Sequence, residues 1–247
     1  MVTRSPVLTT IRGGIISTGS AFLRNVQWIP GVTCSVCAGV PGTGYSICRP
    51  CHGRQWAEGL ADRQGFIAYA WPGHQSGRVM RGYKAAAPAP ANQSLVANLL
   101  VYGIAAHWRC MAHSAWGTPD AWTVVPSLNG RPGDHPLMTI AGPILRAFPM
   151  VPVTAAASVT APRGFVPTNF VVGQTQARHV LLLDDTWTTG GHVQSASAAL
   201  KAAGVQRVTV LTVARWLEPS WAATSDVIGR LTSDLDPDVC PFTGAPC

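Results

Sequence analysis

The sequence predicts an α/β protein with a doubly wound, mostly parallel sheet and a small cysteine-rich module near its N-terminus. Over the second half of the chain, short apolar runs alternate with segments of helical periodicity, which is the pattern of parallel strands joined by crossover helices. Two cysteine pairs, Cys34 with Cys37 and Cys48 with Cys51, precede this region. We therefore expect one main α/β domain preceded by a small metal-binding ribbon.

The composition limits the class of protein. The chain has 247 residues, of which 47% are hydrophobic and only 12% charged, so it can bury a substantial core. No apolar run approaches the roughly 18 residues that a membrane-spanning helix needs, and no secretion signal is recognisable at the N-terminus. We expect a cytoplasmic protein without membrane insertion. The net charge of +7 suits phosphorylated ligands or nucleic acid and does not decide between them.

The two Cys-x-x-Cys pairs are separated by ten residues rich in Gly and Pro. Such a loop allows both pairs to turn toward one centre, which is typical of a tetrahedral zinc site. The predicted ligands are Cys34, Cys37, Cys48 and Cys51. Because cysteine fills every position, the site is structural rather than catalytic. Two disulfides are an alternative that a cytoplasmic location disfavours, and an iron–sulfur cluster is one that the spacing does not exclude.

The most informative stretch follows an unbroken apolar run, Val180–Leu183, which is typical of a strand buried on both faces. The run ends at Asp184 and Asp185, and a Thr- and Gly-rich loop then leads into a helix that ends near Gly204. A strand, a tight turn and a helix N-terminus direct backbone N–H groups at one point, which suits a phosphate. The two carboxylates are placed to hold ribose hydroxyls, or Mg²⁺ through water, so the pattern predicts a phosphorylated ribose as ligand. The alternative is an ordinary strand-end turn with a helix cap.

The remaining elements follow from apolar periodicity. We expect helices within residues 1–30, over Ser94–Trp108 with Ser94 as cap, over Leu137–Phe148 and after Gly191. The expected strands are Ala121–Val125, Met150–Val153, Phe170–Val172, His179–Leu183 and Val208–Val213. In such sheets ligands bind beyond the carboxyl ends of the strands, so we expect the Val125–Ser127 loop and the Asp184 loop to face one pocket.

Leu181–Gly191 resembles the phosphoribosyl pyrophosphate (PRPP) signature of the type I phosphoribosyltransferases, in which Asp-Asp and two variable residues precede Thr-Thr-Gly-Gly-Thr. His192 occupies the place of the last Thr. Together with the four-Cys ribbon, the chain resembles the ComF-like family, which is related to proteins of bacterial DNA uptake. This resemblance extends from Cys34 to about Arg215, and it departs from the family after Arg131-x-Gly133, where Asp134-His135 replaces the usual Asn.

The resemblance implies a phosphoribosyltransferase that displaces pyrophosphate from PRPP with Mg²⁺, the acceptor being unidentified. Asp184 and Asp185 would be the catalytic pair that holds the sugar. Contacts to the 5′-phosphate would come from the loop residues Thr186, Thr188, Thr189, Gly190, Gly191 and His192. Contacts to the pyrophosphate would come from Lys84, Pro126, Ser127, Arg131 and Arg163.

The expected organisation is a ribbon module over residues 1–55, a phosphoribosyltransferase-like domain over 56–225 and a tail over 226–247. Three aspartates of the tail, Asp234, Asp236 and Asp238, suggest a solvated acidic turn. Its cysteine pair, Cys240 and Cys247, leaves three readings open: a metal site completed by Cys110 or a His, a disulfide, or reduced thiols. The alternative function is a non-catalytic accessory of DNA uptake that binds single-stranded DNA or a protein of the competence machinery, with PRPP binding regulatory or vestigial. The sequence leaves homo-oligomerisation open.

Overall fold

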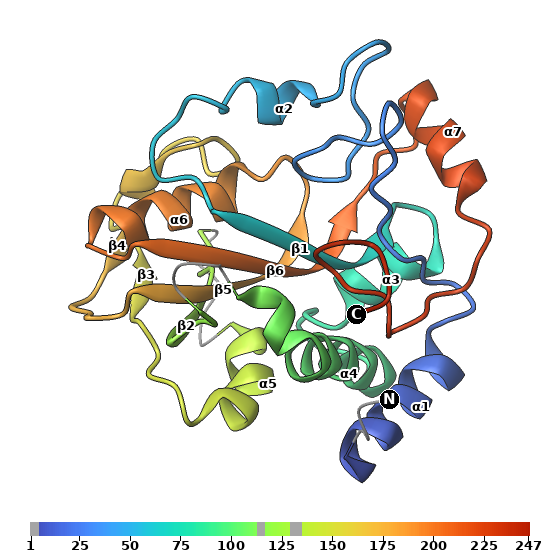
Figure 1. The fold of residues 1–247 in the computed structure, drawn as a ribbon, viewed down its shortest axis with the longest axis horizontal. Coiled ribbons are helices and arrows are strands. Elements are labelled where there is room, and N and C mark those ends of the chain that lie inside the picture. Colours follow the sequence, from blue (N-terminus) through green and yellow to red (C-terminus); the bar gives the residue numbers. More distant parts are fainter. Residues whose placement is uncertain (1–4, 113–116, 129–134) are drawn as a thin grey trace. The chain divides into compact units, whose positions relative to one another are not determined.

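The computed structural model describes residues 5–112, 117–128 and 135–247. Its central feature is a four-stranded parallel sheet of order β1-β6-β5-β2 (Figure 1). A separate antiparallel pair joins β3 and β4. The expected mixed α/β architecture is therefore confirmed. The strands are β1 (Arg63–Ala70), β2 (Ala121–Val124), β3 (Val153–Ala155), β4 (Phe170–Val172), β5 (His179–Trp187) and β6 (Arg207–Trp216).

The helices that the structure describes are α1 (Pro6–Thr18), α2 (Arg49–His52), α3 (Gln75–Gly82), α4 (Pro90–His107), α5 (Pro136–Leu145), α6 (Gly191–Ala202) and α7 (Ala222–Arg230). Two 3-10 turns are η1 (Trp108–Met111) and η2 (Pro167–Asn169). None of the helices in the described ranges combines the length and the apolar character that crossing a membrane requires.

The chain divides into two compact units, each of which is described by itself. The first unit comprises Met1–Cys48, Phe66–Cys110 and Val213–Cys247, and the second comprises Arg49–Gly65 and Met111–Thr212. Strands β1 and β6 contribute residues to both units because the division falls within them.

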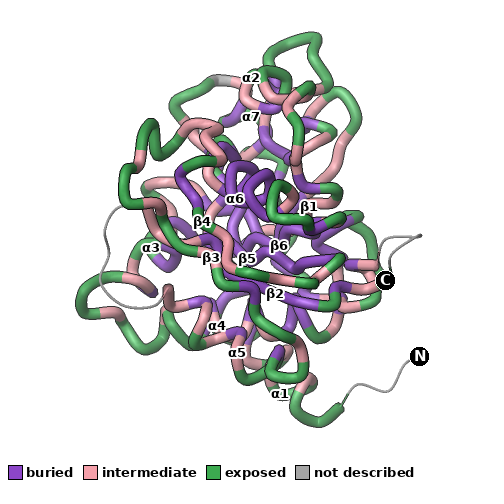
Figure 2. The backbone as a smooth tube through the Cα atoms, turned by 90° about the vertical axis from the view of Figure 1, so that its left-hand side faces the viewer, coloured by how far each residue is buried: buried purple, intermediate pink, exposed green. Residues whose placement is uncertain are grey.

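The second unit is built around β5. Val180–Leu183 are fully buried, as expected for a strand covered on both faces. Helices α5 and α6 lie on opposite sides of β5 (Figure 1), and Figure 2 shows the buried residues concentrated on β5 and α6. Strand β2 pairs with β5 in parallel, with Val124 opposite Leu183. The carboxyl ends of these two strands therefore lie at the same edge of the sheet.

The first unit packs α1 and α3 against α4. Its C-terminal segment is tied down by polar contacts. Asn25 donates to the carbonyl of Asp236 at 2.9 Å, and the Nε of Arg12 lies 3.0 Å from a carboxylate oxygen of Asp238. Arg24 contacts the Asp234 carboxylate at 3.4 Å. As expected for a solvated acidic turn, Asp234 and Asp236 are exposed, whereas Asp238 is half-buried. Each of the three aspartates also has a partner within residues 5–25.

Other differences from expectation have local causes. Strand β5 does not stop before Asp184 but continues through both carboxylates to Trp187. Helix α4 begins at Pro90 after an N-cap at Ala89, because Pro is well suited to the first turn of a helix; Ser94 is not the cap. Strand β1 and helices α3 and α7 were not expected at all.

Candidate functional site

Two carboxylates lie at the carboxyl end of β5. Asp184 and Asp185 are 7% and 5% exposed, and the backbone N–H of Asp185 donates to the Oδ1 of Asp184 at 2.9 Å. Beside them, the N–H of Val125 donates to the carbonyl of Leu183 at 2.9 Å. Parallel pairing therefore brings the chain segment that follows β2, containing Pro126 and Ser127, alongside the aspartate pair.

The turn after β5 places a helix N-terminus next to these carboxylates. Thr188 and Thr189 are exposed, and Gly190 caps α6 with a φ of 80°, a left-handed conformation that glycine adopts without strain. The first backbone N–H groups of a helix have no partner within the helix, and its N-terminal end carries a partial positive charge. The turn thus has the electrostatic character that an anion requires.

A neighbouring loop lies against the first turn of α6. Ser195 donates to the carbonyl of Gly191 and accepts from the N–H of Val166, both at 2.7 Å. A Cβ at Gly191 would lie 2.5 Å from the carbonyl oxygen of Arg163, so only glycine permits this approach. The backbone of Arg163 therefore lies beside the turn, while its side chain is exposed.

Two residues that the sequence did not single out lie at the same place. Arg54 donates a hydrogen bond to the carbonyl of Thr189 within the turn. The Nδ1 of His135 accepts from the N–H of Leu137 at 3.2 Å, so the proton of the neutral ring is on Nε2. That Nε2 lies 3.6 Å from the Oδ2 of Asp185. In the sequence, the only indication of a role for His135 was that Asp134-His135 replaces the family's Asn. Nothing in the sequence indicated a role for Arg54.

The other expected site residues have varied surroundings. Thr186 is half-buried. The ring of His192 stacks on that of Phe170, with centroids 5.3 Å apart and an interplanar angle of 26°, so the ring has a packing role. Lys84 belongs to the first unit, where its Nζ lies 5.9 Å from the ring centroid of Tyr83. Arg131 falls outside the described residues.

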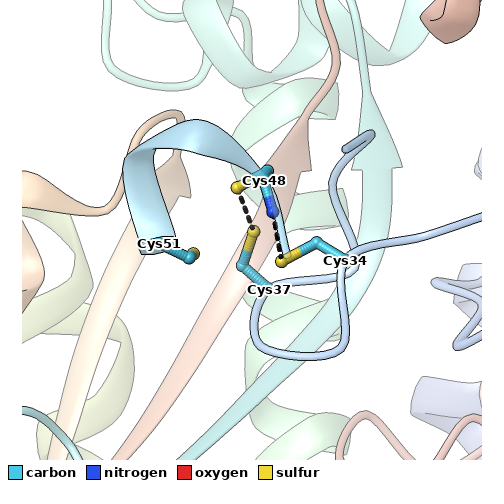
Figure 3. Close-up of side chains that lie close together, drawn as sticks. All are labelled: Cys34, Cys37, Cys48 and Cys51. Atoms are coloured by element: carbon cyan, nitrogen blue, oxygen red, sulfur yellow. Dashed lines mark hydrogen bonds between the residues drawn. The ribbon is translucent and has the colours of Figure 1, made fainter. Parts of the chain in front are cut away.

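The four N-terminal cysteines converge (Figure 3), and their sulfur atoms all lie within 4.8 Å of one another. The Cys37 and Cys48 sulfurs are 3.7 Å apart. This separation agrees with the sulfur–sulfur distance of about 3.8 Å in a tetrahedral site with zinc–sulfur bonds of 2.3 Å. The backbone N–H of Cys48 donates to the Cys34 sulfur at 3.3 Å. No pair of cysteines in the described residues forms a disulfide. The cluster is therefore suited to a structural metal ion.

A buried arginine supports this cluster. Arg215 donates to the carbonyl of Cys37 at 2.7 Å and to its sulfur at 3.3 Å. Burial lowers the pKa of Arg215, but the opposing Cys37 thiolate prevails and holds that pKa above its ordinary value. A Cβ at Gly39 would lie 1.8 Å from the guanidinium. Hydrogen bonds from a second layer of residues orient metal ligands and moderate their charge.

Tyr69 supports the same loop from β1. Its hydroxyl donates to the carbonyl of Ala38 at 2.7 Å, and burial raises its pKa to about 12. The tyrosine therefore stays protonated and keeps its donor throughout the physiological pH range.

Comparison of the chain with protein-family models, with curated proteins and with solved structures gave no match. The family is therefore not established by relatives, and the function has to be argued from the site itself.

Replacing Cys48 by serine should remove one metal ion per chain and unfold the ribbon, because metal binding and folding are coupled in such small modules. Elemental analysis of protein purified under reducing conditions measures the loss, and circular dichroism reports the unfolding. Ser35→Ala, an exposed position in the same loop, is the control and should retain the metal. Equal metal content in Cys48→Ser and the unmodified protein would contradict the assignment.

Replacing Gly39 by alanine should displace the Arg215 guanidinium and lower the free energy of unfolding by about 1–3 kcal/mol, the usual cost of overpacking a buried site. Thermal or denaturant unfolding measures this change. The matched control is Gly42→Ala, whose added Cβ would make only an ordinary contact of 3.5 Å with Tyr45. If both variants unfold alike, the contact between Gly39 and Arg215 has no structural importance.

Proposed function

We propose that this chain is a PRPP-dependent phosphoribosyltransferase of the ComF-like type. One observation carries the proposal: the two buried carboxylates at the end of β5 lead directly, through the left-handed Gly190, into the N-terminus of α6. PRPP presents two hydroxyls and a phosphate on one ribose. The arrangement supplies hydrogen-bond acceptors for the hydroxyls next to backbone donors for the phosphate.

In this proposal the turn Thr188–Gly191 holds the 5′-phosphate. The threonine hydroxyls and the backbone N–H groups donate to the phosphate oxygens, and the α6 dipole favours their negative charge. Arg54, bonded to Thr189, both orders the turn and adds a cation beside it. Asp184 and Asp185 accept hydrogen bonds from the ribose hydroxyls and thereby fix the orientation of the sugar.

The proposed reaction breaks the bond between C1 of the ribose and the pyrophosphate oxygen, while an acceptor nucleophile bonds to C1. Positive charge develops on the sugar ring, and the neighbouring carboxylates stabilise it. The Nε2–H of His135 faces Asp185, with Nε2 3.6 Å from the Oδ2 of that carboxylate. Ser127 and Arg163 are the candidate contacts for the departing pyrophosphate. Mg²⁺, for which the Asp oxygens are suitable ligands, would supply neutralising charge when bound with PRPP.

The proposed metal of the four-Cys cluster is zinc, because four cysteine sulfurs that converge on one point are its usual structural ligands. Since cysteine fills every coordination position, the metal has no open position for substrate. It would stabilise the ribbon and take no part in the transfer.

Asp185→Asn should abolish the transfer and weaken PRPP binding, because it removes a negative charge and an acceptor beside the sugar. Isothermal titration with PRPP and Mg²⁺ measures binding, and release of pyrophosphate across a panel of bases and amines measures turnover. Absence of PRPP binding at millimolar concentration, in folded zinc-replete protein, rejects the proposal. A salt-sensitive shift of single-stranded DNA that survives Asp185→Asn, without turnover, would instead favour the accessory module.

Replacing Arg54 by glutamine should raise the dissociation constant for PRPP about tenfold, equivalent to about 1.4 kcal/mol, because the turn loses both a tether and a nearby cation. The control is Arg230→Gln at the exposed end of α7, which removes the same charge elsewhere. Equal weakening in the two variants would mean that only net charge matters, and no weakening in Arg54→Gln would remove Arg54 from the site.

A further inference from the structure

A second cluster of metal-binding side chains lies within the first unit. His107, Cys110, Cys240 and Cys247 each offer one ligand atom, and these atoms all lie within 4.8 Å of one another. We propose that these four residues form a second structural zinc site, of the Cys₃His type. The proposal is independent of the proposed function, because none of these residues belongs to the candidate PRPP site.

The local backbone brings the four residues together in two pairs. Helix α4 ends at His107, and the 3-10 turn η1 places Cys110 three residues later on the same side. The second pair is joined by a tight loop. In that loop the N–H of Cys240 donates to the carbonyl of Ala245, and the N–H of Gly244 donates back to the carbonyl of Cys240, both at 2.9 Å. Cys240 thus lies in a closed turn, and the antiparallel bridge between Val239 and Pro246 brings Cys247 back alongside it.

The loop between Cys240 and Cys247 is packed against the rest of the first unit. The N–H of Phe66 on β1 donates to the carbonyl of Pro241 at 3.0 Å, and the hydroxyl of Tyr102 on α4 donates to the Asp238 carboxylate at 2.6 Å. Cys240 is 1% exposed. Cys240 and the end of α4 that carries His107 therefore rest on a scaffold that is ordered by contacts other than the metal.

The histidine provides an independent indication. His107 is 2% exposed, and its Nε2 lies 3.0 Å from the carbonyl oxygen of Pro237. A carbonyl only accepts, so Nε2 carries the proton and the lone pair is on Nδ1. That Nδ1 lies 3.2 Å from the sulfur of Cys247. Metal-binding histidines almost always donate their second ring N–H to a carbonyl or carboxylate in this way.

The histidine favours a metal over a disulfide. The sulfurs of Cys110 and Cys247 are 2.9 Å apart, about midway between a disulfide bond of about 2.05 Å and the edge of about 3.8 Å in a tetrahedral zinc–thiolate site, so their separation does not decide between the two. A disulfide would join two of the three cysteines and would not involve the Nδ1 lone pair of His107. Three thiolates with one imidazole are a usual structural ligand set for zinc, whereas Mg²⁺ and Ca²⁺ prefer oxygen ligands.

The test is the zinc content per chain of protein purified under reducing conditions. Two zinc ions per chain are expected in the unmodified protein. Cys247→Ser and Cys110→Ser should each retain only the ion of the four-Cys cluster. Both positions are at least partly exposed, so loss of packing is small. The control Ser233→Ala, exposed in the same C-terminal segment, should keep both ions.

Substitution with Co²⁺ gives a second readout that needs no variant to fold. Its visible spectrum should show two components in the unmodified protein, one from a four-thiolate site and one from a site with three thiolates and an imidazole. One zinc ion per chain, unchanged in both cysteine variants, would overturn the proposal. So would one zinc ion together with a reducible bond between two of Cys110, Cys240 and Cys247, found as a mass lower by two hydrogens in protein purified without reductant.

Discussion

The burial of β5 on both faces is the constraint on which the candidate site depends. Val180–Leu183 are fully enclosed, so the strand cannot shift along the sheet without exposing apolar surface to water. Parallel pairing with β2 fixes the register one residue before Asp184. The two carboxylates and the turn that follows them are therefore positioned by the core, and rigid positioning of this kind is what a reaction without a protein nucleophile requires.

The N-terminal four-Cys cluster lies in a segment that has no apolar core of its own. The segment around Cys34–Cys51 is rich in Gly and Pro and contains only the four-residue helix α2, so it has little regular structure of its own. A metal ion held by the four cysteines would replace the missing core by linking distant points of the chain. Four thiolates around a divalent ion leave a negative charge, and the buried Arg215 guanidinium lies against one of them. Burying either partner without the other would be strongly unfavourable.

The sequence was most informative where a local pattern determines structure. The run Phe170–Val172 forms a strand with the expected limits, and the two cysteine pairs converge as their spacing predicts. Contacts between distant residues were not predictable. Arg54 and Thr189 are 135 residues apart, and Arg215 and Cys37 are 178 apart, so no local periodicity connects them. Strand β1 was missed because its first two residues are polar and only Gly65–Ala70 is buried.

The central claim is that the turn at the carboxyl end of β5 binds the phosphate of a phosphoribosyl ligand. Hydrogen–deuterium exchange of the backbone amides in residues 186–192, measured with and without PRPP and Mg²⁺, tests it most directly. The account predicts slower exchange in this segment when the ligand is present, because the phosphate oxygens accept hydrogen bonds from these amides. Unchanged exchange there at saturating ligand would contradict it.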